Sequence, residues 1–285
     1  MQEAVDFNCS RNIELFFAIY LNGSRVQMAT EPVLTFTDQG RKVTIDVKTD
    51  EALRPRNVDI YVCESQITPS KRNWIKMKGV EKLGESEFRS TYSLVNGGEI
   101  LFVFAVVDYR NGITVSTPIT AHKCPKTQIV KTNLLYKNTH GEGDFTYQVN
   151  EKTLLGGAMC YTLSPITLIK GPMGISGISS SEGLLTFKVG ENCVDIRRDS
   201  IFELDLYCNT EITLKVTMYV GVEGGDTVGY SVYASVTKGE VWQNVILSIK
   251  DFKTADGKSL PENFKPEYLV FSADGFFAIN NVLLI

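Results

Sequence analysis

The chain has 285 residues, a net charge of −4 from 29 basic and 33 acidic residues, and 43% apolar residues. This length predicts about two domains, and the apolar content is enough for packed cores and excludes wholesale disorder. The charges form no long runs, which excludes the basic stripe of a nucleic-acid surface. No apolar run reaches the ~18–20 residues that would span a bilayer.

The first predicted element is a helix over residues 10–22, which Ser10 can cap at its start and Gly23 at its end. One apolar stripe with helical spacing is formed by Ile13, Phe16, Phe17, Tyr20 and Leu21. We expect this stripe to pack on the adjacent domain. The alternative is that the helix is the last one of a catalytic domain lying upstream.

From Pro32 the apolar period changes to two, which is typical of strands with one buried face. Seven short strands are predicted, at residues 33–36, 42–47, 58–64, 73–77, 88–94, 99–109 and 113–119. Asn111 and Gly112 give the strongest hairpin signal of the chain. Seven alternating strands in ~90 residues predict an immunoglobulin-like or fibronectin-like β-sandwich over residues 32–121.

Polar and basic residues 122–132 are predicted to link this sandwich to a second domain, residues 133–285. The Gly/Ser-rich residues 171–183 are predicted to form a loop. Strands are predicted at residues 134–137, 145–149, 159–163, 184–189, 193–198, 201–208, 211–221 and 229–236, followed by three closing segments. This pattern predicts a jelly roll. The fold class is therefore all-β: two β-sandwich domains after an N-terminal helical lead-in, residues 1–31.

The closing segments are residues 241–252, 267–274 and 276–285, and the last of them ends on apolar residues that need a core to enter. We therefore expect it to be a paired strand inside the sandwich. These segments resemble the closing strands of jelly-roll carbohydrate-binding modules. The matching residues are Trp242, Val245, Asp251, Phe252, Ile279, Asn280, Asn281 and Val282. By this resemblance Trp242 is expected to belong to the core.

The first sandwich resembles the small β-domain that follows the catalytic domain in some secreted α/β-hydrolase-type carbohydrate esterases. The matching residues are Arg72, Trp74, Gly84, 100–107, Asp108, Asn111, Gly112, Ser116, Thr117 and Pro118. The resemblance implies an accessory domain of such an enzyme, secreted or at the cell surface. No signal peptide is predicted, because Glu3 and Asp6 stand where basic residues are expected. An export signal would lie upstream.

No catalytic constellation is predicted. The Gly–x–Ser–x–Gly nucleophile elbow is absent, and the chain's two histidines are poor material for a Ser–His–Asp relay. Glu203 and Asp205 share one strand face, and paired carboxylates can hydrolyse glycosides. Acidic alternation is more often a solvated strand face, so we expect no catalytic residue in this chain.

Carbohydrate binding needs aromatic rings for the C–H face of a pyranose and polar groups for its hydroxyls. Strand periodicity places three tyrosines among polar residues on outer faces. The predicted carbohydrate-binding residues are Tyr219, Tyr233, Tyr207, Lys215, Asp205 and Glu203. Tyr219 and Tyr233 fall on expected hairpin partners, whose rings could form one platform if both strands share a sheet. The alternative is that the tyrosines only cover cross-strand neighbours.

No metal site or cofactor is predicted. The six cysteines form no CxxC pair and fit no zinc template, and we expect buried thiols rather than disulfides. Many jelly-roll modules hold a structural calcium with an aspartate in the closing strand. Asn280 stands at that position here, so calcium is not expected.

The predicted function is non-catalytic binding of a plant cell-wall polysaccharide or oligosaccharide, within a modular polysaccharide-degrading enzyme such as an esterase. We expect a monomer with no nucleic-acid partner. One alternative is a cell-surface adhesion or structural protein. A second is a self-contained carbohydrate esterase or glycosidase.

Overall fold

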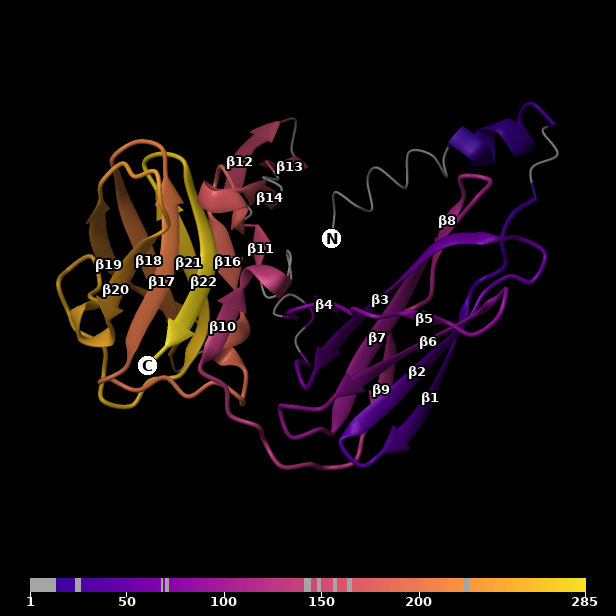
Figure 1. Cartoon of the computed structure of the whole chain (residues 1–285), viewed down its shortest axis with the longest axis horizontal. Helices are drawn as coiled ribbons and strands as arrows, with labels where there is room; N and C mark the ends of the chain where they lie inside the picture. The colour runs from indigo at the N-terminus through magenta and orange to yellow at the C-terminus, as the bar shows by residue number, and fades with distance from the viewer. Residues whose placement is uncertain are drawn as a thin grey trace. The chain divides into compact units, whose positions relative to one another are not determined.

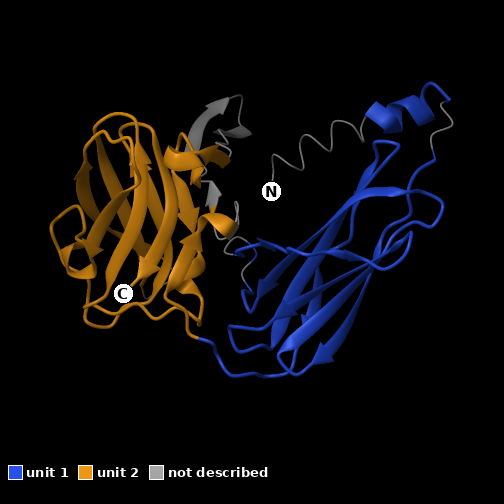
Figure 2. Cartoon of the chain, viewed as in Figure 1, with its two compact units in different colours: residues 1–130 blue, residues 131–285 orange. Residues whose placement is uncertain are grey.

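The computed structural model describes residues 14–23, 27–67, 69, 72–140, 145–147, 150–155, 158–162, 166–222 and 226–285. The chain forms two compact units, Met1–Val130 and Lys131–Ile285 (Figure 2). Among the described residues, no helix is long and apolar enough to cross a membrane.

Unit 1 is built from two antiparallel sheets (Figure 1). The first, in spatial order, contains β1 (Val33–Gln39), β2 (Lys42–Lys48), β6 (Glu87–Ser93) and β5 (Glu81–Lys82). The second contains β4 (Ile75–Lys76), β3 (Pro55–Glu64), β7 (Ile100–Tyr109) and β8 (Thr114–Ser116), and β9 (Thr120–Lys123) also pairs with β7. Alternate residues enter the core, as Val43, Ile45 and Val47 do at 1% exposure or less. The predicted β-sandwich is confirmed.

The end of unit 1 differs from the predicted linker. Residues 120–123 form β9, and the chain beyond it remains bound to the sandwich. The amide of Thr127 donates to the Gly97 carbonyl at 2.8 Å, and that of Val130 donates to the Val95 carbonyl at 2.9 Å. Backbone pairing therefore holds residues 122–130, which their polar composition had assigned to a linker.

The N-terminal helix is described over residues 14–20, and its orientation differs from the prediction. Leu15 is 6% exposed and belongs to the core of unit 1. The described part of the predicted stripe faces solvent instead, with exposures of 50% for Phe16, 67% for Tyr20 and 73% for Leu21. The predicted cap Ser10 and stripe residue Ile13 lie outside the described residues. One buried leucine outside the stripe therefore sets the contact with the sandwich.

Asp50 ties the segment before β1 to the loop after β2. Its carboxylate accepts hydrogen bonds from the amide and hydroxyl of Thr30, both at 2.9 Å, and from the Ala52 amide at 2.7 Å. The Thr30 amide is the main cause that lowers the pKa of Asp50 below its usual value. Asp50 therefore stabilises unit 1 while it is ionised.

We expect Asp50→Asn to lower the free energy of unfolding of unit 1 at pH 7 by at least about 1 kcal/mol, because the amide removes the charge and one acceptor oxygen. A lowered folded-state pKa gives stability above the unfolded-state pKa of ~3.9, and this stability is lost as the pH falls further. The difference between wild type and variant should shrink below about pH 4. Urea unfolding at pH 7 and pH 3 measures this difference in the free energy of unfolding between wild type and variant. An undiminished difference at pH 3 would contradict this role.

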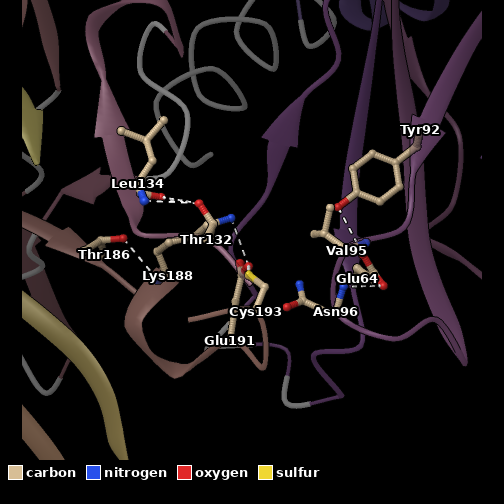
Figure 3. Close-up of polar contacts among 10 residues, drawn as sticks. All are labelled: Glu64, Tyr92, Val95, Asn96, Thr132, Leu134, Thr186, Lys188, Glu191 and Cys193. Carbon is tan, nitrogen blue, oxygen red and sulfur yellow. Dashed lines mark hydrogen bonds and ion pairs between the residues drawn. The ribbon is translucent and has the colours of Figure 1, made fainter. Parts of the chain in front are cut away.

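Glu64 holds a tight turn in unit 1 (Figure 3). Its side chain is 6% exposed and accepts hydrogen bonds from three backbone amides, Val95 at 2.7 Å and Asn96 and Gly98 at 2.9 Å each. The Tyr92 hydroxyl is a fourth donor at 3.3 Å. The turn needs glycine, because Gly98 has φ +79° and a Cβ there would lie 2.2 Å from the Pro125 carbonyl oxygen.

Unit 2 has two large antiparallel sheets, here called sheet C and sheet D (Figure 1). Sheet C contains β14 (Thr167–Lys170), β15 (Ser176–Ser179), β22 (Phe277–Leu284), β17 (Ile201–Cys208) and β20 (Gln243–Ser248), and β10 (Leu134–Lys137) also pairs with β22. Sheet D contains β11 (Thr146–Tyr147), β16 (Leu184–Thr186), β21 (Pro266–Ala273), β18 (Ile212–Gly221) and β19 (Thr227–Val236). A separate hairpin joins β12 (Asn150–Leu155) and β13 (Ala158–Thr162).

The inner faces of both sheets supply the core of unit 2, for example Phe202 and Leu204 from β17 and Leu214 and Val216 from β18, all 0% exposed. The closing strand β22 lies inside sheet C, between β17 on one side and β10 and β15 on the other. The predicted pairing of the chain's last segment is therefore confirmed.

Two local predictions in unit 2 are wrong. The predicted loop 171–183 contains β15, in which Ile178 enters the core while Gly177 faces outward beneath Trp242. The predicted strand 193–198 is irregular, although Cys193 is buried. In the described part of unit 2, short helical turns are η2 (Asn138–His140), η3 (Pro172–Gly174), η4 (Lys188–Gly190) and η5 (Ile249–Asp251).

A partly buried ion pair joins η4 to the loop that follows it (Figure 3). The Lys188 ammonium lies 3.0 Å from the Glu191 carboxylate, and the Cys193 thiol donates to the same carboxylate at 3.4 Å. Burial, followed by the charge of Glu191, raises the pKa of Cys193 to about 12. Cys63, Cys124, Cys193 and Cys208 are buried thiols, as expected from the sequence for these four. The side chains of Cys9 and Cys160 lie outside the described part of the chain.

Candidate functional site

The outer face of sheet D carries three of the predicted binding residues. In β18, Leu214, Val216 and Met218 are fully buried while Lys215 and Tyr219 are half-buried on the opposite side. Tyr233 lies on β19 and is 62% exposed. The predicted outward placement of these three side chains follows from the alternation of apolar and polar residues.

The hairpin register separates the two predicted rings. β18 and β19 pair directly, with Lys215 opposite Tyr233 and Tyr219 opposite Gly229. The two tyrosines are therefore offset by four residues, or roughly 13 Å along the strands. They share one face of one sheet, but they do not form the continuous platform that was considered from the sequence.

Tyr219 belongs instead to a row of aromatic rings that crosses sheet D. Its ring stacks on Tyr268 of β21, with centroids 4.4 Å apart and planes 15° apart. Phe187 lies next in the row, 5.6 Å from Tyr268. On the other side the row ends at Gly229, where an added Cβ would lie 3.2 Å from the Tyr219 ring. The Tyr219 ring therefore lies between the Tyr268 ring and the Gly229 backbone.

Tyr233 and Lys215 form the opposite border of this face. The Lys215 ammonium lies 5.8 Å from the centroid of the Tyr233 ring, within the range of a cation–π contact. Ser272 of β21 is the next residue in this row, opposite Lys215. This border therefore combines one freely accessible ring with hydrogen-bond donors.

Short side chains lie between the two rows. Thr217 is paired with Ser231 on one side and Val270 on the other. Thr217 is 7% exposed and Val270 is 5% exposed although both are on the outer face, so their neighbours cover them. The Thr217 and Ser231 hydroxyls are hydrogen-bonded at 2.9 Å. The outer face of sheet D thus has a low, partly polar centre between an aromatic row and the Tyr233–Lys215 border.

The other three predicted residues, Glu203, Asp205 and Tyr207, lie on β17 in sheet C. They point outward as predicted, but from the opposite sheet of the sandwich, because the chain crosses between the sheets after β17. The six predicted residues therefore do not form one site. Glu203 accepts a hydrogen bond from the Asn244 side chain at 2.7 Å, which is typical of a solvated strand face.

Tyr207 has aromatic neighbours on the outer side of sheet C. Its ring centroid lies 6.0 Å from Trp242 and 6.3 Å from Phe276. Trp242 was expected in the core, but it is half-buried and lies over Gly171 and Gly177. Its indole nitrogen is buried without a hydrogen-bond partner among the described residues. Glycines at these two positions let the ring approach the backbone.

The sequence missed two members of the site, Tyr268 and Phe187. Both lay within predicted strands, and period two places Tyr268 on the same side as Ser272. What the sequence lacked was the order of the strands in the sheet, since β21 pairs with β18 from far along the chain. The paired residues Tyr219 and Tyr268 are 49 positions apart. Outward aromatics can be found from periodicity, but their neighbours cannot.

No family model and no curated protein matches the chain. Solved structures that are similar to parts of it include the following three. The xylanase 10B modules of Clostridium thermocellum, solved with xylohexaose, have 14% identity and a TM-score of 0.32, and the match covers 43% of this chain and 24% of that one.

The second structure is a family 11 carbohydrate-binding module of Clostridium thermocellum, solved with a β-1,3-1,4-mixed-linked tetrasaccharide. It has 12% identity and a TM-score of 0.37 over 55% of this chain and 97% of that chain. The third is SGBP-B from a xyloglucan utilization locus of Bacteroides uniformis, with 9% identity and a TM-score of 0.27 over 91% of this chain and 99% of that one.

Proposed function

We propose that unit 2 is a non-catalytic carbohydrate-binding module that takes a plant cell-wall polysaccharide on the outer face of sheet D. The observation that carries this proposal is the exposed Tyr233 ring beside Lys215, across a low polar centre from the stacked pair Tyr219 and Tyr268. A pyranose presents an apolar face and a rim of hydroxyls, and this surface offers partners for both.

The residues have distinct roles in this proposal. Tyr233 stacks on one sugar because its ring is accessible, whereas the stacked Tyr219–Tyr268 pair borders the next sugars with its hydroxyls and ring edges. Lys215, Ser231 and Ser272 donate hydrogen bonds to sugar hydroxyls. The polymer runs across the strands, because the aromatic row and the Tyr233–Lys215 border both run in that direction.

The test is calorimetry against xylan, mixed-linkage β-glucan, xyloglucan and soluble cellulose derivatives. We expect Tyr233→Ala to weaken binding at least several-fold, or roughly 1 kcal/mol, since one stacking contact is lost. Its stability should change by less than about 0.5 kcal/mol, because the residue is exposed. Tyr219→Ala should weaken binding and also lower the melting temperature, because it removes the stack on Tyr268.

Tyr207→Ala on sheet C is the matched control and should leave affinity unchanged. If Tyr207→Ala abolishes binding while Tyr233→Ala and Tyr219→Ala do not, the ligand lies on the opposite face. If no polysaccharide binds the wild type, the adhesion alternative becomes the better interpretation.

The wider context is part of the proposal. In a modular polysaccharide-degrading enzyme, such as an esterase, the module would raise the local enzyme concentration on the polymer without any chemistry of its own. Unit 1 would then be an accessory domain between the catalytic part and the module. The reading frame upstream of Met1 tests this directly: a secretion signal and a hydrolase domain support it, and another kind of domain contradicts it.

A further inference from the structure

A group of three different metal-ligand side chains lies in unit 1, far from sheet D in sequence and independent of the proposed function. Asp38 is near the end of β1, His122 is on β9, and Cys124 follows β9. One ligand atom from each, a carboxylate oxygen, an imidazole nitrogen and the thiol sulfur, all lie within 4.8 Å of one another. The His122 Nε2 and Asp38 Oδ1 atoms are 3.0 Å apart.

The backbone holds the three residues in place. His122 is paired with Leu101 of β7, and the Cys124 amide donates to the Glu99 carbonyl at 2.9 Å. His122 and Cys124 are two residues apart in an extended segment, which puts both side chains on the same side. Asp38 is paired with Val43 in the β1–β2 hairpin. None of the three positions therefore depends on a long loop.

The imidazole is also oriented before any metal arrives. Its ring stacks on Phe36 of β1, with centroids 4.5 Å apart and planes 13° apart. This contact keeps His122 Nε2 directed at Asp38. The three side chains therefore need only small movements to bind a metal ion. In a tetrahedral zinc site with bonds of ~2.0–2.3 Å, ligand atoms are about 3.3–3.8 Å apart. The distance of 3.0 Å between His122 Nε2 and Asp38 Oδ1, and the limit of 4.8 Å within which all three ligand atoms lie, are compatible with such a site after small adjustments.

We propose that Asp38, His122 and Cys124 bind a divalent transition metal, Zn²⁺ above all, with water as the fourth ligand. Oxygen, nitrogen and sulfur are the ligand types that zinc accepts, whereas a thiolate disfavours calcium and magnesium. A carboxylate and a thiolate together balance the charge of the ion. A search for cysteine spacing misses this site, because Asp38 lies 84 residues before His122.

Cys124 is buried, and this burial, followed by the charges of Asp38 and Glu64, raises the pKa of its thiol to about 11. A metal ion that binds the sulfur as a thiolate releases the thiol proton.

The experiment uses Co²⁺ as a spectroscopic probe on the full chain without a histidine tag. We expect one Co²⁺ per chain with a thiolate-to-cobalt band in the near ultraviolet, which Zn²⁺ abolishes by displacement. Cys124→Ser should remove this band. The matched control is Cys63→Ser, which changes another buried thiol of unit 1 and should keep the band.

Two further variants protect the test against a folding defect. His122→Ala and Asp38→Asn change more accessible side chains, and each should weaken Co²⁺ binding at least tenfold while circular dichroism stays that of the wild type. Zn²⁺ should raise the melting temperature of the wild type and not that of Cys124→Ser. Absence of a thiolate band at saturating Co²⁺, or a band that survives Cys124→Ser, overturns the proposal.

Discussion

Glu64→Ala is expected to lower the free energy of unfolding of unit 1 by at least about 3 kcal/mol. The substitution removes the acceptor of three backbone amides, of which those of Asn96 and Gly98 are in buried hydrogen bonds. Each buried amide left without an acceptor costs about 1–3 kcal/mol. The summed cost is therefore larger than that of most substitutions of surface residues. The turn at residues 95–98 should then lose its fixed conformation.

The two tryptophans of the chain make this measurable, since Trp74 lies in unit 1 and Trp242 in unit 2. Urea unfolding followed by fluorescence in a Trp242→Phe background reports on unit 1. Glu81→Ala, which changes an exposed carboxylate of the same unit, is the control and should stay within about 0.5 kcal/mol of the parent. A loss below about 1 kcal/mol for Glu64→Ala would show that water replaces the carboxylate.

Gly177→Ala should destabilise unit 2 by about 2 kcal/mol or more. Its Cβ would lie 2.5 Å from the Trp242 ring and 2.8 Å from the Ile279 carbonyl oxygen. The ring can move aside, but the carbonyl belongs to β22 inside sheet C and cannot move without breaking strand pairing. Overpacking at this position therefore acts on the centre of the sheet.

A double-mutant cycle separates the two contacts. In a Trp242→Ala background, Gly177→Ala should cost less than in the wild type but should not become neutral, because the carbonyl contact remains. Gly84→Ala is the control, since an added Cβ there meets its nearest atom at 3.8 Å. Urea unfolding followed by far-ultraviolet circular dichroism measures the four proteins of the cycle and the control. Full additivity of the two changes would rule out the ring contact.

The alternation of apolar and polar residues was enough to predict most strands and their inward faces, as in β17 and β18. This alternation failed to predict the structure at two places, residues 171–183 and the N-terminal helix. Gly177 made residues 171–183 look like a loop, yet the missing side chain is what lets Trp242 lie against β15. For the N-terminal helix, the larger apolar stripe indicated the wrong face, because burial depends on one leucine that reaches the core.

The candidate site could be predicted residue by residue but not as an assembly. Periodicity fixes the side of a strand on which Tyr207, Tyr219 and Tyr233 lie. It does not fix the sheet to which a strand belongs, so Tyr207 was grouped with residues of the other face. Likewise, the group of Asp38, His122 and Cys124 joins two distant strands, and no local pattern carries that information.

The place of β22 in sheet C also governs when unit 2 can fold during synthesis. Leu134 pairs with Leu283, so the sheet cannot be completed until the ribosome has added roughly 150 further residues. At ~5–20 residues per second, β10 waits about 8–30 s for its central partner, and β15 and β17 wait for a shorter part of that interval. Apolar residues of these strands, such as Phe202 and Ile178, stay exposed during that interval. The described strands of unit 1 are complete by residue 123, so unit 1 can fold first, and a chaperone that binds nascent chains would find its main sites in unit 2.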